Sequence, residues 1–336
     1  GSTLCDTPQN GRSRTGWGGG VMKVCNLVEA YIAYRRSLGE KYQSPAVILR
    51  SFARYIGEDK ECMSIDEKIC TAFLYSPNNI VSASWFLRYS SLKWMFEWAI
   101  VRGYMQEVVL PKEKPKALEH VKPYIYSAEE LKRIFELALS YQKNKSKTPP
   151  RCVQAILKLT YVLGLRISET ISLQLKDLNL CEKYLVIRES KFYKSRMVPF
   201  NDQVVLLLND FLGWRKAQGW PSDNETFVFL DKNMDRLSID VVRNAFERIR
   251  EMAGIKRTDG SRYQPRLHDL RHSFAVHRLT EWYRSGKDVN RLLNSLSTYL
   301  GHDHISNTSV YLSMTDDLLS EANNLFNAYR NGKVET

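Results

Sequence analysis

Apolar residues recur at helical spacing in four stretches of the first third of the chain. The intervals of three and four residues between them are typical of helices that bury one face. The alternating pattern of a strand is missing from this region, and glycines follow most of the stretches as helix stops. The four predicted helices cover residues 22–39, 47–56, 65–74 and 85–100. We therefore predict a compact domain of four helices over residues 22–109.

The composition changes after this domain. Residues 110–126 are rich in proline and lysine and have little to bury, so we interpret them as a basic linker. A capping box, Ser127–Glu130, then opens a helix, and residues 184–187 and 196–199 have the composition of two hairpin strands. Further helices are predicted over residues 153–163, 202–218, 238–253, 268–283, 289–300 and 316–329. The predicted fold class is mainly α with a small β-sheet, with a second, α+β domain over residues 127–336.

Length and charge narrow the class of protein. The chain has 336 residues and a formal net charge of +12, from 49 lysines and arginines against 37 acidic residues. This charge favours a polyanionic partner, without saying which one. A hydrophobic content of 43% is too high for a disordered chain, and no run of about 18 apolar residues could span a membrane. Residues 1–21 are rich in Gly, Ser and Thr and lack the apolar region of a signal peptide, so we interpret them as a flexible leader, a tail or a cloning scar.

Metal-binding patterns are missing from the sequence. None of the six cysteines forms a CxxC pair, and no Cys/His cluster has the spacing of zinc ligands. The HExxH, DxD and GxxxxGK patterns are absent as well. We therefore predict no metal and no cofactor, and six unpaired thiols in a reducing cytoplasm.

Six residues of the second domain are suited to bind a phosphate or to attack it. Each alone has an ordinary explanation: an arginine beside Glu169 could be a helix-start ion pair, and a lone tyrosine usually packs in a core. Only as an ordered set do they indicate a reaction centre. They are Arg166 in Gly-Leu-Arg-Ile-Ser-Glu, Lys191 on the predicted hairpin, His268 and Arg271 in His-Asp-Leu-Arg, His302 in Leu-Gly-His, and Tyr311 nine residues later.

This ordered set resembles the signature of the tyrosine recombinases, the phage-integrase and Xer-type family. Two departures accompany the match. Lys191 has serine and phenylalanine neighbours where the family usually has glycines, so Lys194 is an alternative to it, and the interval from Arg271 to His302 is longer than in compact members. The resemblance implies a site-specific recombinase or integrase, serving a mobile element or replicon, that cuts and rejoins DNA. It would act through a 3′-phosphotyrosyl intermediate and a Holliday junction, without metal or ATP.

The chemistry of phosphate transfer suits these residue types. The guanidiniums of Arg166 and Arg271 would neutralise the nonbridging oxygens, and Tyr311 would attack the phosphorus and hold the strand covalently. Lys191 would protonate the departing 5′ oxygen. His268 would accept the tyrosine proton or orient the phosphate, which His302 would also hydrogen-bond. Three other histidines are interpreted as packing or surface residues, although the last lies near His302 in the sequence: His272, His277 and His304.

Basic residues in both domains are candidates for contact with double-stranded DNA. Contacts to phosphates supply salt-sensitive affinity rather than sequence choice. The alternative interpretation is a set of solubilising surfaces. The candidates, which together could form a clamp around a duplex, are Arg35, Arg36, Lys41, Arg50, Lys143, Lys145, Lys147, Arg243, Arg248, Lys256 and Arg257.

The end of the chain carries an amphipathic pattern over residues 316–329. This helix could fold back on its own core or, as the resemblance implies, dock in trans within a homotetramer on synapsed DNA. Two other functions stay open. A type IB topoisomerase would relax any plasmid, and a non-catalytic architectural DNA-binding protein would never become covalently attached. The predicted location is the cytoplasm, in association with the nucleoid.

Overall fold

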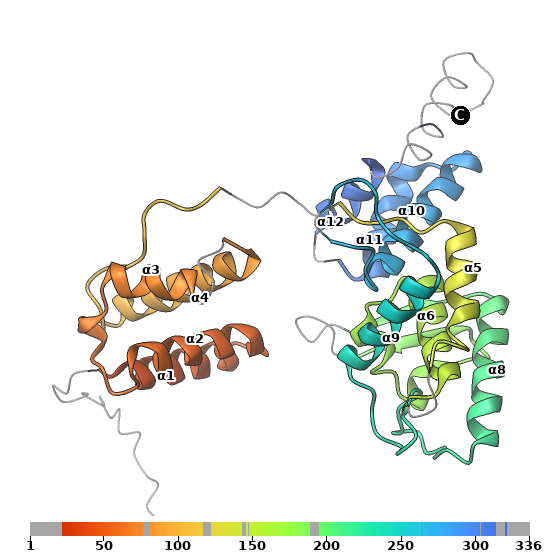
Figure 1. The fold of residues 1–336 in the computed structure, drawn as a ribbon, viewed down its shortest axis with the longest axis horizontal. Helices are drawn as coiled ribbons and strands as arrows, with labels where there is room; N and C mark the ends of the chain where they lie inside the picture. The colour runs from red at the N-terminus through yellow and green to blue at the C-terminus, as the bar shows by residue number, and fades with distance from the viewer. Residues whose placement is uncertain are drawn as a thin grey trace, which may run out of the picture. The chain divides into compact units, whose positions relative to one another are not determined.

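The structure is a computed structural model that describes residues 22–76, 81–116, 122–142, 146, 148–188, 195–261, 263–302, 304–313 and 320. The chain divides into two compact units, with the division between residues 119 and 120. Each unit has a hydrophobic core of its own. Figure 1 shows the helices and strands of both units.

Four helices build the described part of the first unit. They are α1 (Val24–Ser37), α2 (Gln43–Ile56), α3 (Glu67–Tyr75) and α4 (Ala83–Val101), with the 3-10 turn η1 (Cys62–Ser64) before α3. All four predicted helices are confirmed, although α2 begins four residues before its predicted start at residue 47. Pro45 lies in the first turn of α2, where backbone N–H groups have no acceptor within the helix, so proline loses no hydrogen bond there. Side chains from several helices fill the core, among them Leu27, Leu49, Phe52, Leu92 and Phe96, all fully buried.

Helices also dominate the second unit. They are α5 (Ala128–Leu137), α6 (Pro150–Val162), α7 (Ile167–Thr170), α8 (Asp202–Ala217), α9 (Ile239–Met252), α10 (Asp269–Arg284), α11 (Val289–Leu300) and α12 (Ser306–Ser309), with the 3-10 turns η2 (Leu175–Asp177) and η4 (Val310–Ser313). The predicted capping box of α5 is confirmed. The Ser127 hydroxyl accepts a hydrogen bond from Glu130 N at 3.2 Å, and Ser127 N donates to Glu130 Oε2 at 2.9 Å. The helix predicted over residues 316–329 lies, apart from Ser320, outside the described residues.

Three short strands form an antiparallel sheet in the order β1-β2-β3. They are β1 (Leu178–Asn179), β2 (Tyr184–Ile187) and β3 (Arg196–Pro199). Leu185 of β2 pairs with Val198 of β3, and both are fully buried on the core face of the sheet. The two predicted strands are confirmed. Strand β1 was not predicted, because two residues are too few to show an alternating pattern. The predicted fold class, mainly α with a small sheet, is confirmed.

Three helix ends meet in the second unit. The central helix α10 packs against α6 and η4, and α11 packs against β3. Helix α6 ends at Val162, two residues before Gly164, and α11 ends at Leu300, directly before Gly301; the φ angles of the two glycines are +59° and +67°. A Cβ on Gly164 would lie 2.3 Å from Cδ1 of Phe274 on α10, so only glycine permits this close approach. The C-terminal ends of α6 and α11 thereby reach the first turn of α10.

Three features are missing from the described part of the chain. No helix there is long and apolar enough to cross a membrane. No group of three or more His, Cys, Asp and Glu side chains is arranged to hold a metal ion. The five described cysteines form no disulfide, as predicted for them: Cys25, Cys62, Cys70, Cys152 and Cys181.

Candidate active site

Five of the six residues predicted to act on a phosphate are described, and they come from the helix ends of the second unit. Arg166 is the N-cap of α7, His268 is the N-cap of α10, and Arg271 lies in the first turn of α10. His302 follows the end of α11, and Tyr311 lies on η4. Other predicted residues lie outside the described residues: Lys191, its alternative Lys194, and Lys143, Lys145 and Lys147.

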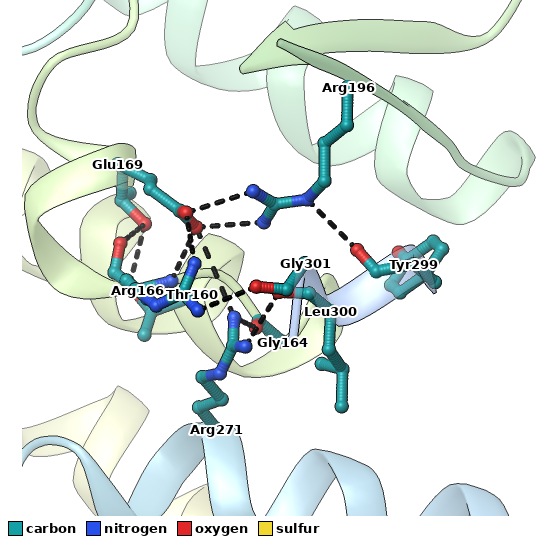
Figure 2. A network of polar contacts seen from close by, with 10 residues as sticks. Thr160, Gly164, Arg166, Glu169, Arg196, Arg271, Tyr299, Leu300 and Gly301 are labelled. Atoms are coloured by element: carbon teal, nitrogen blue, oxygen red, sulfur yellow. Dashed lines mark hydrogen bonds and ion pairs between the residues drawn. The ribbon is translucent and has the colours of Figure 1, made fainter. Parts of the chain in front are cut away.

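Arg271 is almost completely buried, with 1% of its surface exposed, and backbone carbonyls hold its guanidinium. Nη1 donates to the Gly164 carbonyl at 2.7 Å, and Nη2 donates to the Leu300 carbonyl at 2.6 Å (Figure 2). Leu300 is the last residue of α11 and Gly164 lies two residues beyond α6, so both carbonyls lie near the negative ends of helix dipoles. Burial, and then the nearby charge of Arg166, lowers the pKa of Arg271 to about 10. Arg271 therefore still carries a charge at neutral pH.

Arg166 lies beside Arg271 and is more open to solvent. Its Nη2 donates to the Gly301 carbonyl at 2.7 Å, and its Nη1 donates to Glu169 Oε1 at 2.8 Å. The side chain keeps 31% of its surface exposed. The predicted helix-start ion pair with Glu169 is therefore present, and it coexists with a guanidinium that a phosphate can reach.

Glu169 joins three guanidiniums in one buried network (Figure 2). Arg196 donates to both of its oxygens, from Nη1 to Oε1 at 2.9 Å and from Nη2 to Oε2 at 2.8 Å. Arg271 Nη1 lies 3.9 Å from Oε2. Burial by itself would raise the pKa of Glu169, but the hydrogen bonds and charges of Arg196 and Arg166 hold it at about 2. Glu169 is therefore an anion at every physiological pH.

Arg196 is a member of this network that no sequence motif indicated. It lies on β3, and besides Glu169 it contacts the end of α11, where Nε donates to the Tyr299 carbonyl at 3.0 Å. Its side chain is 12% exposed, which is unusual for a charged residue that only covers a sheet. The signal in the sequence is weak, because an arginine that begins a short strand is common at protein surfaces.

The hydroxyl of Tyr311 is buried and has a histidine partner. The tyrosine is 3% exposed, and its Oη lies 3.0 Å from Nδ1 of His272. Burial raises the pKa of Tyr311, which the charges of Arg271 and Arg166 oppose. The interpretation of His272 as a packing or surface residue was therefore incomplete, because it overlooked a polar contact of this side chain. A signal was present, since His272 follows His268 by four residues and so shares its helix face.

The remaining histidines differ in their surroundings. His268 is exposed, and its ring lies edge-on to that of His272 with 4.8 Å between the centroids. His302 Nδ1 lies 2.7 Å from the Thr308 hydroxyl, a contact that ties the end of α11 to α12. Burial, and then Arg271, lowers the pKa of His302 to about 4, so the ring is neutral. Outside the site, His277 bonds Tyr161 as a packing residue, and His304 is exposed.

Seven of the predicted DNA-binding residues fall into two groups. In one, the guanidinium already has an acidic partner, as in the pairs of Arg35 with Glu40, Arg50 with Glu29, Arg243 with Asp240 and Arg257 with Asp259. In the other, the side chain is exposed and has no ion pair with any described residue: Arg36, Arg248 and Lys256. Lys41 is exposed too. The contact of these residues with DNA stays a prediction.

The chain is similar to known integrases and recombinases. The model of the phage integrase family matches residues 126–317, more than half of the chain. A Sinorhizobium fredii protein described as an integrase/recombinase is 29% identical over 297 residues, which cover 88% of this chain and 94% of the relative. The tyrosine recombinase XerC of Oceanobacillus iheyensis is 30% identical, with 69% of this chain and 70% of the relative covered.

A solved structure shares the fold. The lambda integrase tetramer bound to a Holliday junction matches with a TM-score of 0.61 at 18% identity, covering 89% of this chain and 79% of that one. The family match includes every residue of the site built above, from Arg166 to Tyr311. The chain therefore belongs to the phage integrase family, the tyrosine recombinases.

Proposed function

We propose that this protein is a site-specific DNA recombinase that cuts and rejoins strands through a covalent bond to Tyr311. One observation carries the proposal: a tyrosine hydroxyl lies in the same site as two guanidiniums that helix-end carbonyls and Glu169 hold in place. Fixed cations that surround the position of a developing charge stabilise a transition state without reorganising at the moment of reaction. A protein that only binds DNA would have no need of this arrangement.

Each group has a proposed task in the reaction. Arg166 and Arg271 bind the nonbridging oxygens of the scissile phosphate, because each terminal guanidinium nitrogen keeps a second hydrogen beyond its bond to the protein. Tyr311 Oη attacks the phosphorus, and the bond to the 5′ oxygen breaks. Lys191 gives that oxygen a proton, and His268 and His302 hydrogen-bond the phosphate. The phosphotyrosine keeps the energy of the phosphodiester, so a 5′ hydroxyl can rejoin the strand without ATP.

The wider reaction follows from the same chemistry. Exchange of two strands at a time between two sites gives a Holliday junction and requires four protomers, two at each site. The lambda integrase tetramer on a Holliday junction, whose fold this chain shares, supports such an assembly. We propose further that residues 22–109 also contact the DNA, that residues 110–126 link the two domains, and that residues 316–329 dock on a neighbouring protomer. We also propose that the protein serves a mobile element; the Sinorhizobium relative described as an integrase/recombinase supports integration or recombination of DNA as its reaction.

Covalent capture tests this proposal. The protein is incubated in EDTA with fragmented DNA from its source, quenched with detergent and analysed for protein-bound DNA, with Tyr311→Phe alongside. We expect an adduct that the substitution abolishes, because phenylalanine has no nucleophilic oxygen. Sequencing of the captured ends then gives the recombination site.

Other outcomes contradict specific parts of the proposal. An adduct that survives in Tyr311→Phe would assign the nucleophile to another residue. Capture at random ends, with relaxation of any plasmid, would indicate a topoisomerase. Tight, salt-sensitive binding without any adduct would indicate a protein that binds DNA without cutting it.

A further inference from the structure

His272 is a polar residue of the site that the proposed reaction does not yet use. It lies on α10, one turn after His268. Its Nδ1 is 3.0 Å from the Tyr311 hydroxyl, the oxygen that would attack the phosphorus. The centroids of the His272 and Tyr311 rings are 5.5 Å apart. A buried tyrosine and an imidazole at hydrogen-bond distance meet the first geometric requirement for a general base.

The surroundings of His272 keep its lone pair available. Burial, and then the ring of His268, lowers the pKa of His272 to about 3, so the imidazole is neutral at physiological pH. The cations Arg266 and Arg271 and the ring of His302 also act on it. With the ring proton on Nε2, Nδ1 accepts the hydrogen bond that Tyr311 Oη donates.

The two histidines of α10 differ in what they can reach. His268 keeps more exposed surface than His272, and its ring has no hydrogen bond to any described residue. His272 lies deeper and contacts the tyrosine directly. The exposed ring is open to a phosphate that enters, whereas the deeper ring is next to the proton that has to leave. The sequence left open whether His268 accepts the tyrosine proton or orients the phosphate.

We propose that His272, rather than His268, accepts the proton of Tyr311 during cleavage and returns it during rejoining; this role rests on the proposed function. The proton moves from Oη to Nδ1 while Oη bonds to phosphorus and the bond between phosphorus and the 5′ oxygen breaks. The leaving oxygen takes its proton from Lys191, so the atoms and charges balance. In the reverse step the imidazolium protonates the departing tyrosine.

A bound phosphodiester makes this transfer easier than it is in the free protein. Its negative charge between Arg166 and Arg271 offsets the cations that disfavour a second proton on the His272 ring. The same negative charge opposes ionisation of the tyrosine without an acceptor nearby. A neighbouring base that removes the proton as the bond forms avoids a free phenolate at neutral pH.

The experiment measures single-turnover cleavage of the captured site as a function of pH. Three variants are compared with the wild type: His272→Ala, His272→Asn and His277→Ala. Asparagine can place an oxygen near the position of Nδ1 and hold the hydroxyl, but it cannot take up a proton. His277 is the matched control, because it lies on the same helix and its Nδ1 is 2.9 Å from another tyrosine hydroxyl, that of Tyr161. Unfolding curves and DNA affinity establish that each variant is folded.

We expect both His272 variants to cleave roughly 10²–10⁴-fold more slowly than the wild type at pH 7. Their rate should rise about tenfold per pH unit, since hydroxide must then ionise the tyrosine. The wild type and His277→Ala should share a faster rate and a flatter profile. A residue that only supports the fold would lower the rate without changing this slope.

Several results would overturn the role of His272. Unchanged or faster cleavage by His272→Ala would mean that the contact merely holds the tyrosine at rest. A wild-type rate in His272→Asn would mean positioning without proton transfer. A steep pH profile in His268→Ala, with a flat one in His272→Ala, would assign the base to His268. Failure of the wild type to form an adduct would instead overturn the proposed function, and this role with it.

Discussion

Glu169 lies between three guanidiniums and supplies the negative charge that offsets their mutual repulsion. Its two oxygens fix Arg196 and Arg166, and its negative charge lowers the repulsion between them and Arg271. Without an anion here, buried cations would face each other at short range, which is costly in a low-dielectric interior. Glu169 therefore holds Arg166 and Arg196 in place and offsets the charge of Arg271.

Replacement of Glu169 by glutamine should lower the free energy of unfolding by about 3 kcal/mol at pH 7, because each pKa unit corresponds to about 1.4 kcal/mol. The pKa of Glu169 falls from its ordinary value of 4.5 to about 2 on folding. The stabilisation is thus complete above the ordinary value and disappears as the pH falls toward 2. Urea unfolding of the wild type and Glu169→Gln should show a gap that narrows over this range.

The exposed carboxylate of Glu182 provides the control for this measurement. Glu182→Gln should change the free energy of unfolding little at any pH, because a surface charge has weak interactions. A gap between the wild type and Glu169→Gln that stays constant from neutral to acid pH would show that Glu169 acts through its shape rather than its charge.

Sequence alone revealed the residues of the site that lie in short, specific patterns. Arg166 and Arg271 could be predicted because their neighbours form a signature. Arg196 and His272 were not predicted, because their contacts span 27 and 39 residues of sequence, although the step of four residues from His268 put His272 on the same helix face. Nothing in the local pattern indicates that a strand arginine meets a distant glutamate, or that a helix histidine meets a tyrosine.

The helices contribute to the site through their ends. Arg271 donates hydrogen bonds to the carbonyl of Leu300, the last residue of α11, and to that of Gly164, two residues beyond α6, and Arg166 donates to the carbonyl of Gly301 beyond α11. These groups have no partners within their helices, and the guanidiniums provide them. The direction and the stopping points of two helices therefore fix where the cations lie.

Gly301→Ala should impair cleavage, whereas Gly254→Ala should not. Both glycines have a positive φ, +67° and +68°, so alanine at either position should cost about 1–2 kcal/mol of stability. A Cβ on Gly301 would lie 2.9 Å from Nη1 of Arg196, but one on Gly254 would meet nothing within 4 Å. We expect adduct formation to fall roughly 10²-fold in Gly301→Ala alone, since displaced arginines misplace the phosphate. Equal losses of adduct formation in Gly301→Ala and Gly254→Ala would mean that backbone strain alone causes the loss.

Most elements could be predicted from apolar periodicity, and the exceptions have a physical reason. The bounds of α11 agree with the prediction to the residue, because Asp288 caps its start and Gly301 its end. The short elements α7 and β1 were not predicted, because four and two residues are too few to show the apolar periodicity of a helix or a strand. Tertiary contacts, rather than local preference, determine such short pieces.

The net charge of +12 belongs to the whole molecule, but only some of its cations are free to bind a polyanion. Composition counts them all alike. In the structure, partners distant in sequence neutralise several of them, as Glu29 on α1 does for Arg50 on α2. The sequence therefore predicts that the partner is negatively charged, but only the structure shows which of the described cations already have an acidic partner.

The double variant Arg248→Ala with Lys256→Ala should weaken DNA binding and make it less dependent on salt. Each lost phosphate contact lowers the slope of log affinity against log salt by about 1, so we expect a fall of about 2. Binding measured at several salt concentrations checks this. The control, Lys216→Ala with Lys232→Ala, removes the same charge from other exposed positions of the second unit and should leave the slope nearly unchanged. Equal effects in both pairs would mean that overall charge, and not local contact, governs affinity.

The use of main-chain carbonyls to hold Arg166 and Arg271 has a consequence for variation of the protein. A side-chain acceptor disappears with one codon change, but a carbonyl remains whichever residue occupies the position. At Leu300, for example, another apolar residue of similar volume would keep the acceptor for Arg271. Many substitutions of neighbouring residues should therefore leave the hydrogen bonds of Arg166 and Arg271 unchanged. Libraries that alter target-site preference could therefore vary many neighbouring side chains while the cutting machinery stays intact.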